Sequence, residues 1–285
     1  MSRAIRLSRA PRPARPNRPL TRRIRSAALA VTAAAAGLAA FTAIGPARAA
    51  GPVNYVALGD SYSSGDGAGS YSDGSCLESA NAYPVLWHNS HGGTFTNETC
   101  SGATTSDVIN GQLGSLSAST TLVTITIGGN DVGFASVMTT CVLSSTSTCV
   151  SAVQQAESEA RTVLPGLLDT TFADIRAHAP NAKIVVLDYP AFYDLSKSST
   201  CIGLSTTDRT YLNQGAGVLD SVIQAETGKY GDTYVDVNPY FAGHQICDSH
   251  SYLISVDWLN LGDSYHPNAN GQQYGYLPAL VAVTG

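Results

Sequence analysis

The sequence predicts an α/β fold in which a central parallel sheet is covered by helices on both faces. Five short runs rich in apolar and β-branched residues have the length of buried strands, at residues 53–58, 94–99, 122–127, 183–187 and 233–237. Stretches with helical spacing lie between them, and strands that alternate with helices form parallel sheets. Ligands bind such sheets beyond the carboxyl ends of the strands. The residues that follow each run are therefore the first candidates for a functional site.

Each element has its own local signal. The run at 53–58 ends at Gly59, which predicts a tight turn that contains Ser61. The run at 94–99 leads into Gly102, and the run at 122–127 is the clearest strand because it is β-branched and ends at a Gly-Gly-Asn-Asp turn. Residues 150–179 have helical spacing that Pro165 should kink or divide. A last helix is expected after Pro267, through residues 273–283, although it contains a proline.

The first 49 residues differ in composition from the rest. Nine arginines and no acidic residue lie in the first 25 positions, an alanine-rich apolar stretch covers 27–44, and Ala47-Arg48-Ala49 fits a small-x-small cleavage site. We therefore expect residues 1–49 to be a secretory signal peptide. An uncleaved membrane anchor is the alternative, but the apolar stretch is barely long enough to span a bilayer. Arg22-Arg23 leaves twin-arginine export open beside the general route.

Residues 50–285 are expected to form a single domain. These 236 residues are enough for a substantial core, and no linker, repeat or charge block divides their sequence. They contain six basic and all 21 acidic residues, which gives a net charge of −15. Such a surface repels nucleic-acid phosphates and anionic lipid headgroups. We therefore expect no nucleic-acid partner and no stable membrane anchoring, and we expect a monomer.

All six cysteines lie after residue 50, and an even number in an exported protein favours disulfides over metal ligation. Zinc binding is disfavoured because the sequence has no CxxC pair and no histidine pair at ligand spacing. Six cysteines allow 15 connectivities. The shortest loops are closed by the pairs Cys76 with Cys100, Cys141 with Cys149, and Cys201 with Cys247.

Two motifs follow the ends of predicted strands. Gly59-Asp60-Ser61 precedes Tyr-Ser-Ser-Gly, and a strand-to-helix turn of this kind exposes a serine hydroxyl together with the following amides. Its alternative is an ordinary helix N-cap. Asn130 lies in Gly-Gly-Asn-Asp, where its side-chain amide could donate a hydrogen bond to an oxyanion. The alternative here is a turn with a capping residue.

Two further motifs complete the set. Asp263 lies three residues before His266, so that the acid could hold one imidazole nitrogen while the other faces a nucleophile. A surface Asp and His before a helix are the alternative. Gly102, in Cys-Ser-Gly-Ala-Thr, offers a main-chain amide that no side chain obstructs. The five other histidines have no comparable setting.

The motifs GDSYSSG, SGATT, GGND and DSYHPN together resemble the SGNH subgroup of the GDSL hydrolases, in order and in spacing. The subgroup is named after a Ser, a Gly, an Asn and a His, which match Ser61, Gly102, Asn130 and His266. The resemblance covers essentially all of residues 50–285. The sequence looks most similar to secreted actinomycete (Streptomyces-type) lipases and esterases of this family.

The resemblance implies a flavodoxin-like three-layer α/β/α sandwich, three disulfides paired in sequence order, and hydrolysis of acyl esters with no metal or organic cofactor. It implies that Ser61 is the nucleophile, that His266 is the base and that Asp263 orients it. The oxyanion hole would consist of the Ser61 and Gly102 amides and the Asn130 side chain. Some family members use a main-chain carbonyl in place of the acid, so both possibilities stay open here.

The implied substrates are acylglycerols, phospholipids or simple esters. A carbohydrate acetylesterase on the same scaffold is a second interpretation, which the lack of a sugar-binding module in the sequence disfavours. A non-catalytic binding protein is a third, disfavoured because every expected catalytic residue is present. Residues 133–149 and 191–209 follow strand ends and are expected to be pocket loops.

Overall fold

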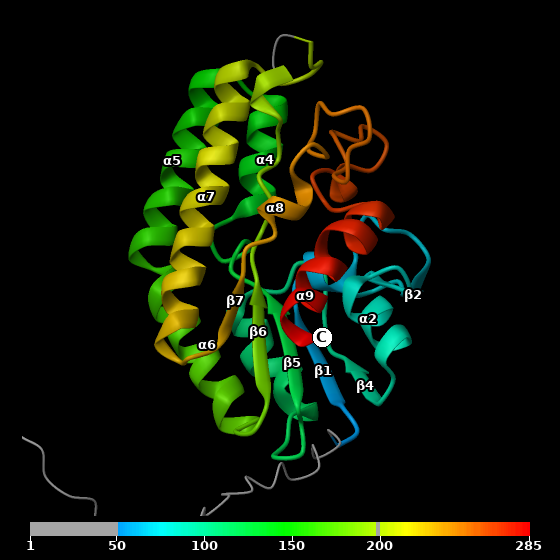
Figure 1. The fold of residues 1–285 in the computed structure, drawn as a ribbon. Coiled ribbons are helices and arrows are strands. Elements are labelled where there is room, and N and C mark those ends of the chain that lie inside the picture. The colour runs from blue at the N-terminus through cyan, green and yellow to red at the C-terminus, as the bar shows by residue number, and fades with distance from the viewer. Residues whose placement is uncertain (1–50, 198–199) are drawn as a thin grey trace, which may run out of the picture. The chain divides into compact units, whose positions relative to one another are not determined.

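The computed structural model describes residues 51–197 and 200–285, and a five-stranded parallel sheet lies at its centre (Figure 1). The strand order is β4-β1-β5-β6-β7, and every neighbouring pair is parallel. Numbered along the chain within this sheet, the order is 2-1-3-4-5, that of flavodoxin-like folds. The predicted parallel α/β architecture is confirmed. The predicted signal peptide, residues 1–49, lies outside the described residues.

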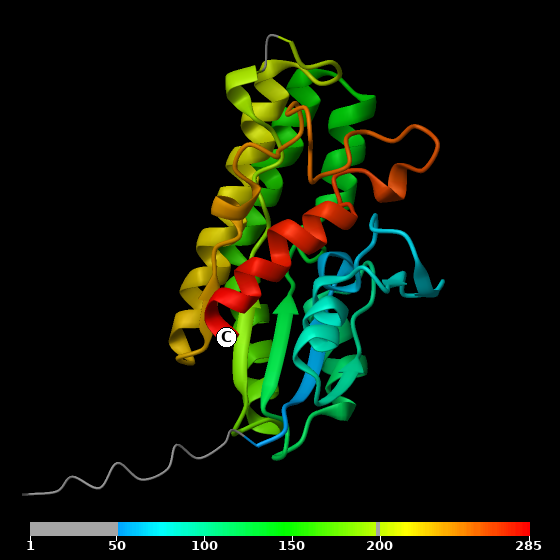
Figure 2. The ribbon, with the colours of Figure 1, turned by 45° about the vertical axis from the view of Figure 1, so that its right-hand side comes forward.

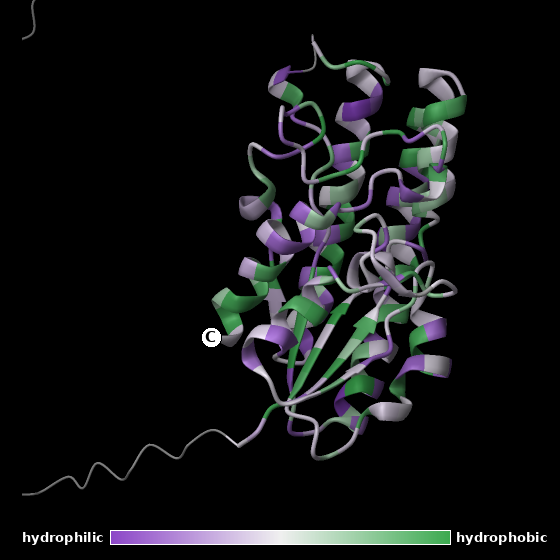
Figure 3. Ribbon diagram, turned by 90° about the vertical axis from the view of Figure 1, so that its right-hand side faces the viewer, coloured by the Kyte–Doolittle hydropathy of each residue, from purple (hydrophilic) through white to green (hydrophobic). Residues whose placement is uncertain are grey.

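The strands lie where the apolar runs predict them, with small differences at their ends. Their bounds are β1 (Asn54–Gly59), β4 (Thr94–Asn97), β5 (Leu122–Thr126), β6 (Lys183–Leu187) and β7 (Thr233–Val235). All of β5 is buried, as is β6 except for its first residue. Strands covered on both faces are continuously apolar rather than alternating. Figure 3 shows hydrophobic colours along these strands.

Helices cover both faces of the sheet, as Figures 1 and 2 show. On one face α2 (Tyr83–His91) packs against α9 (Leu277–Thr284), which also contacts β7. On the other face α3 (Thr105–Asp107) and the π-helical segment η1 (Val108–Gln112) pack against α6 (Leu164–His178). Helix α7 (Thr206–Lys229) contacts β7, α6 and α5 (Thr146–Thr162), and α5 contacts α4 (Phe134–Leu143). These layers form the predicted three-layer sandwich.

The remaining elements are short and lie mostly in the connections. They are α1 (Ser61–Ser64), a two-stranded antiparallel sheet of β2 (Tyr71–Asp73) and β3 (Glu78–Ser79), α8 (Asn238–Phe241), the 3-10 turns η2 (Leu113–Ser115), η3 (Leu195–Lys197) and η4 (Leu261–Asp263), and the π-helical η5 (Gly271–Tyr276).

The two prolines expected to disturb helices have different settings. Residues 150–179 are divided as predicted, because α5 ends at Thr162 and Pro165 lies in the first turn of α6. Pro278 lies in the first turn of α9, which continues without a break from the π-helical η5, so the last helix contains this proline beside a wider helical turn. The expectation of a loop at 133–149 is wrong. This segment forms α4 and the beginning of α5.

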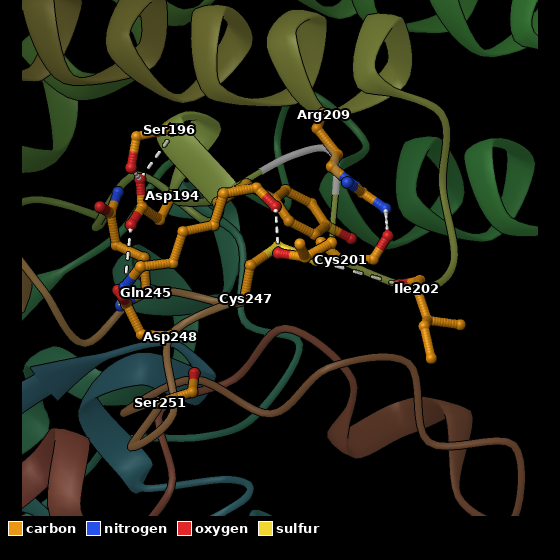
Figure 4. Close-up of a disulfide and its surroundings, with 12 residues drawn as sticks. Asp194, Ser196, Cys201, Ile202, Arg209, Gln245, Cys247, Asp248 and Ser251 are labelled. Atoms are coloured by element: carbon orange, nitrogen blue, oxygen red, sulfur yellow. Dashed lines mark hydrogen bonds and ion pairs between the residues drawn. A yellow bond between two sulfur atoms is a disulfide. The ribbon is translucent and has the colours of Figure 1, made fainter.

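The structure pairs the cysteines in sequence order, Cys76 with Cys100, Cys141 with Cys149, and Cys201 with Cys247, and leaves none free for a metal. Figure 4 shows the third bridge, which joins the segment before α7 to the chain after α8. The buried Arg209 supports it by donating a hydrogen bond of 2.7 Å to the Cys201 carbonyl. This bridge therefore links the long helix to the segment that leads toward His266.

Within residues 51–197 and 200–285, none of the helices has both the length and the apolar character needed to cross a bilayer.

The Cys201–Cys247 bridge encloses 46 residues, so removing it should release considerable entropy in the unfolded chain. We predict that Cys201→Ala/Cys247→Ala lowers the free energy of unfolding by about 2–5 kcal/mol. Urea unfolding at neutral pH measures this difference. The same comparison after full reduction of both proteins is the control, and there the difference should largely disappear. A variant as stable as the oxidised parent would contradict the assignment.

Candidate active site

Ser61 lies in a sharp turn at the end of β1. Gly59 has φ of +118°, and a Cβ atom there would lie 2.4 Å from the Thr126 carbonyl oxygen of β5, so that only glycine fits. Asp60 then caps α1 by accepting a hydrogen bond of 3.0 Å from the Tyr62 amide. The chain therefore turns directly from strand to helix, and Ser61 lies beyond the carboxyl end of β1.

Two buried glutamines hold this turn in place. Gln112 accepts a hydrogen bond of 2.7 Å from the Gly59 amide and donates one of 2.9 Å to the Gly59 carbonyl. Gln272 donates to the Tyr62 carbonyl at 3.0 Å and accepts from the Tyr83 amide at 2.9 Å. Both side chains are at least 95% buried. They satisfy the Gly59 amide before Ser61 and the Tyr62 carbonyl after it, and add a second donor to the Gly59 carbonyl.

A third buried group joins three strand ends. The Asp60 carboxylate accepts a hydrogen bond from the Tyr189 hydroxyl, which itself accepts one of 3.0 Å from the Gly129 amide. Tyr189 follows β6, and Gly129 follows β5. Burial raises the pKa of Asp60 to about 7, against the opposing effect of the Tyr189 and Tyr62 hydrogen bonds. Asp60 therefore fixes the position of the turn rather than facing the cavity.

His266 is brought to Ser61 by an unusual backbone conformation. Tyr265 has φ of +69°, a left-handed geometry that is uncommon for a bulky residue. Tyr265 is buried. Its carbonyl accepts a hydrogen bond of 2.9 Å from the Tyr62 hydroxyl, and its amide donates one of 2.8 Å to the Ile254 carbonyl. This anchorage points the imidazole at the turn. The distance from His266 Nε2 to Ser61 Oγ is 2.8 Å.

The other imidazole nitrogen, His266 Nδ1, is buried and forms no hydrogen bond within the described residues. Asp263 is near enough for its charge to favour the imidazolium, yet its carboxylate does not hold Nδ1. Burial lowers the pKa of His266, while the Asp66 charge, the Gly262 carbonyl and the Asp263 charge act in the opposite direction. The histidine is therefore neutral at pH 7 and able to accept a proton.

Gly102 and Asn130 lie side by side on the opposite wall. The Asn130 side-chain amide donates a hydrogen bond of 2.9 Å to the Ala103 carbonyl, which leaves its second N–H for another acceptor. Asp131 accepts hydrogen bonds from the amide and hydroxyl of Thr105. Gly102 has φ of +82°, and its amide donates no hydrogen bond within the part of the chain that the structure describes. The loop that contains Gly102 therefore leaves the Gly102 amide available beside Ser61.

These residues share one cavity of about 390 Å³. Its polar end is lined by Ser61, Asp66, Ser101, Gly102, Asn130, Ser264 and His266. Its apolar walls come mainly from α4 and η4, with Phe134, Met138, Val142, Leu143 and Leu261. Residues 133–149 therefore line it as a helix rather than as a loop. None of the described residues 191–197 and 200–209 does so, although Phe192 lines a second, apolar cavity of about 50 Å³.

The cavity lies at the point where the strand order reverses, between β1 and β5, which is where flavodoxin-like sheets bind ligands. A serine hydroxyl within hydrogen-bond distance of a neutral imidazole at this point defines a three-layer α/β hydrolase. Comparison with known proteins agrees with this class. The model of the GDSL-like lipase/acylhydrolase family matches residues 57–274.

Several Streptomyces proteins are similar over most of the chain. "Lipase 1" of Streptomyces coelicolor is 51% identical over 260 residues, 90% of this chain and 95% of the relative. The crystal structure of phospholipase A1 from Streptomyces albidoflavus has a TM-score of 0.79 at 50% identity, over 81% of this chain and 99% of that one. An extracellular lipase of Streptomyces rimosus has a TM-score of 0.79 at 47% identity, over 81% and 100%. The chain belongs to the GDSL-like lipase/acylhydrolase family and is an ester hydrolase.

The sequence patterns did not indicate some residues of the site. Gln112, Gln272 and Tyr189 lie in helices or loops without a recognisable motif, and only the fold brings them to the turn. Asp66 is different, because it follows GDSYSSG directly. A carboxylate next to a candidate nucleophile was a signal that could have been used.

Gln112→Met should destabilise the protein, because it leaves the buried Gly59 amide without an acceptor. The Gly59 carbonyl keeps a second donor, the Cys100 amide at 3.0 Å, so one orphaned group is created. We expect a loss of about 1–3 kcal/mol in urea unfolding. The exposed Gln154→Met on α5 is the matched control and should change stability by less than about 0.5 kcal/mol. Equal effects in the two variants would show that Gln112 does not hold the turn.

Proposed function

We propose that this protein is an exported lipase in which Ser61 attacks the ester carbonyl and His266 takes its proton. The 2.8 Å contact between Ser61 Oγ and His266 Nε2 is the observation that carries the proposal. A serine hydroxyl is a weak nucleophile until a base accepts its proton, and a partly buried, neutral imidazole at this distance is such a base.

The oxyanion that forms in this attack would be bound by three donors. The Ser61 and Gly102 amides and the Asn130 side chain lie around one end of the cavity, and the open Gly102 amide supports this assignment. The Ala103 carbonyl fixes the Asn130 amide before substrate arrives, so that little reorganisation is needed during the reaction. The imidazolium of His266 then protonates the leaving alcohol, and water repeats the sequence to release the acid.

In this mechanism Asp263 acts on His266 through its charge. The carboxylate makes no hydrogen bond to Nδ1, but it favours the protonated imidazole, as does the Gly262 carbonyl. Both groups that the family uses beside this histidine, an acid and a main-chain carbonyl, are thus present here. We assign to Asp263 the stabilisation of the imidazolium that forms in the reaction.

The walls and rim of the cavity support long-chain lipid esters as substrates. Leu143 and Leu261 line it and are 61% and 45% exposed. Trp258 and Leu259, which precede Leu261 closely, are 67% and 99% exposed. Exposed apolar side chains at the mouth of a cavity are typical of a site that receives apolar ligands. The similar Streptomyces proteins named lipase and phospholipase A1 support the same class of substrate.

Export is supported by three observations. Residues 1–49 have the composition of a signal peptide, and three disulfides suit an oxidising compartment. One similar structure is that of an extracellular lipase. We propose that residues 50–285 act outside the cell as a single domain and as a monomer, on small-molecule or lipid esters.

Ser61→Ala should abolish turnover while preserving the fold, because only the nucleophilic oxygen is removed. We expect a fluorophosphonate probe to label the parent protein at Ser61 and to leave Ser61→Ala unlabelled. Ser63→Ala, two residues further along the same helix, is the control and should still be labelled. Labelling of Ser61→Ala to the parent level would disprove the nucleophile assignment.

Activity should increase with acyl length from acetyl toward longer chains, because each added methylene can be buried against α4 at about 0.8 kcal/mol when fully enclosed. The kcat/KM values of soluble p-nitrophenyl esters from two to eight carbons measure this trend. Leu143→Ser should reduce the increase of kcat/KM with acyl length without lowering kcat/KM for the acetate ester. A maximum at acetate would favour the carbohydrate acetylesterase instead.

A further inference from the structure

Asp66 is a buried acid beside the candidate nucleophile, and the mechanism above gives it no role. It follows α1 by two residues, is 3% exposed and lines the cavity of the active site. The Asp66 amide donates a hydrogen bond of 3.1 Å to the Ser61 carbonyl. One carboxylate oxygen, Oδ2, accepts a hydrogen bond of 2.8 Å from the Ser101 hydroxyl. The other, Oδ1, is buried and accepts no hydrogen bond from an N–H or hydroxyl of the described residues, and the Asp66 carboxylate is close enough to the Asp263 carboxyl to interact with it.

The turn that carries Asp66 packs directly against His266. A Cβ atom at Gly67 would lie 3.0 Å from His266 Cβ, so the two segments are in close contact. His266 Nδ1 is likewise buried and unpartnered. The Asp66 acceptor and the His266 ring therefore lie in the same small region, where the Gly262 and Asp263 carbonyls also favour the protonated ring. Unsatisfied buried groups of this kind are costly, and they persist where function needs them.

The electrostatics of His266 agree with this placement. Among the charges that oppose the effect of burial on the pKa of His266, that of Asp66 is the strongest and exceeds that of Asp263. Burial and then the Asp66 charge raise the pKa of Asp263, which shows that the two acids are close together. Asp66 is the more buried of the pair, so water screens its charge less.

We propose that Asp66 is the main positioning residue for His266, with a carboxylate that stabilises the imidazolium formed when Ser61 attacks. Through Ser101 the same carboxylate ties the histidine side of the site to the Gly102 loop. The proposal rests on the proposed function, in which His266 is the base. The acid that mainly stabilises the His266 imidazolium is then Asp66, which follows Ser61 in the chain, rather than Asp263, which precedes His266.

Other titratable groups near His266 set the background for a pH test. Two are acids that precede His266 in the chain, Asp263 and Asp257. The others are Tyr71 and Tyr62, and burial raises the pKa values of these two tyrosines. The tyrosines stay neutral in the acid range, and the pKa of Asp263 should fall in Asp66→Asn because it loses a negative neighbour, so Asp263 stays ionised where His266 titrates. Loss of the Asp66 charge should therefore lower the pKa of His266, because the imidazolium loses a negative neighbour.

The test compares three variants. Asp66→Asn removes the charge but keeps an oxygen that can accept from Ser101, whereas Ser101→Ala removes that hydrogen bond and keeps the charge. Asp257→Asn removes a carboxylate of the same region that does not line the cavity. The pKa of His266 is read from imidazole NMR signals in the free protein, with His266→Ala for assignment, and kcat and KM are measured across pH with a soluble short ester.

For Asp66→Asn we expect the pKa of His266 to fall by at least about one unit and kcat to fall by at least about tenfold, with KM little changed. The acid limb of kcat/KM should move to lower pH by the same amount. Ser101→Ala and Asp257→Asn should shift this pKa by less than half as much, and Asp263→Asn by less than Asp66→Asn.

An unchanged pKa of His266 in Asp66→Asn would overturn the proposal, as would an equal shift in Ser101→Ala. A failure of the proposed function looks different. In that case the pKa of His266 measured by NMR would still fall in Asp66→Asn. The acid limb of kcat/KM in the parent protein, however, would not coincide with the pKa of His266.

Discussion

The buried carboxylate of Asp60 is the constraint on which the rest of the site depends. It accepts hydrogen bonds from the Tyr62 amide and the Tyr189 hydroxyl, and Tyr189 in turn accepts one from the Gly129 amide. The ends of β1, β5 and β6 are thereby fixed relative to one another at the point where the strand order reverses. A buried acid is costly to desolvate, and these donors offset that cost. The turn that carries Ser61 and the Gly-Gly-Asn turn are consequently parts of one rigid unit.

The parts of the structure that could be predicted from the sequence are those with a local signal. A buried parallel strand needs a continuous apolar run, and each of the five runs corresponds to a strand. Because parallel strands end at the same edge, the positions of Ser61, Gly102 and Asn130 along the chain were enough to place them together. Pro165 also acts locally, since it lacks the N–H that a continuous helix would need.

The remaining features depend on contacts between distant segments, which leave no local pattern. Gln112 is 53 residues from Gly59, and Gln272 is 210 from Tyr62, so nothing in their surroundings indicated that they clamp a turn. The segment 133–149 contains serines and threonines that suggest a loop, but its apolar residues pack toward the cavity as α4. The 24-residue helix α7 had no signal as clear as that of α5 and α6, because it mixes polar and apolar residues and contains Gly-Ala-Gly at 215–217 in its central part.

Two opposing effects act on His266, and their balance explains why the site has this form. Burial disfavours the imidazolium and keeps the resting histidine neutral, as a base must be. The proposed mechanism then places a positive charge on the same partly buried ring, and burial alone would make that step expensive. Acids at the edge of the site reduce this cost without charging the histidine at rest. Because Asp263 is partly exposed and makes no hydrogen bond to Nδ1, much of this compensation has to come from a more buried group, and Asp66 is the acid whose position meets that requirement.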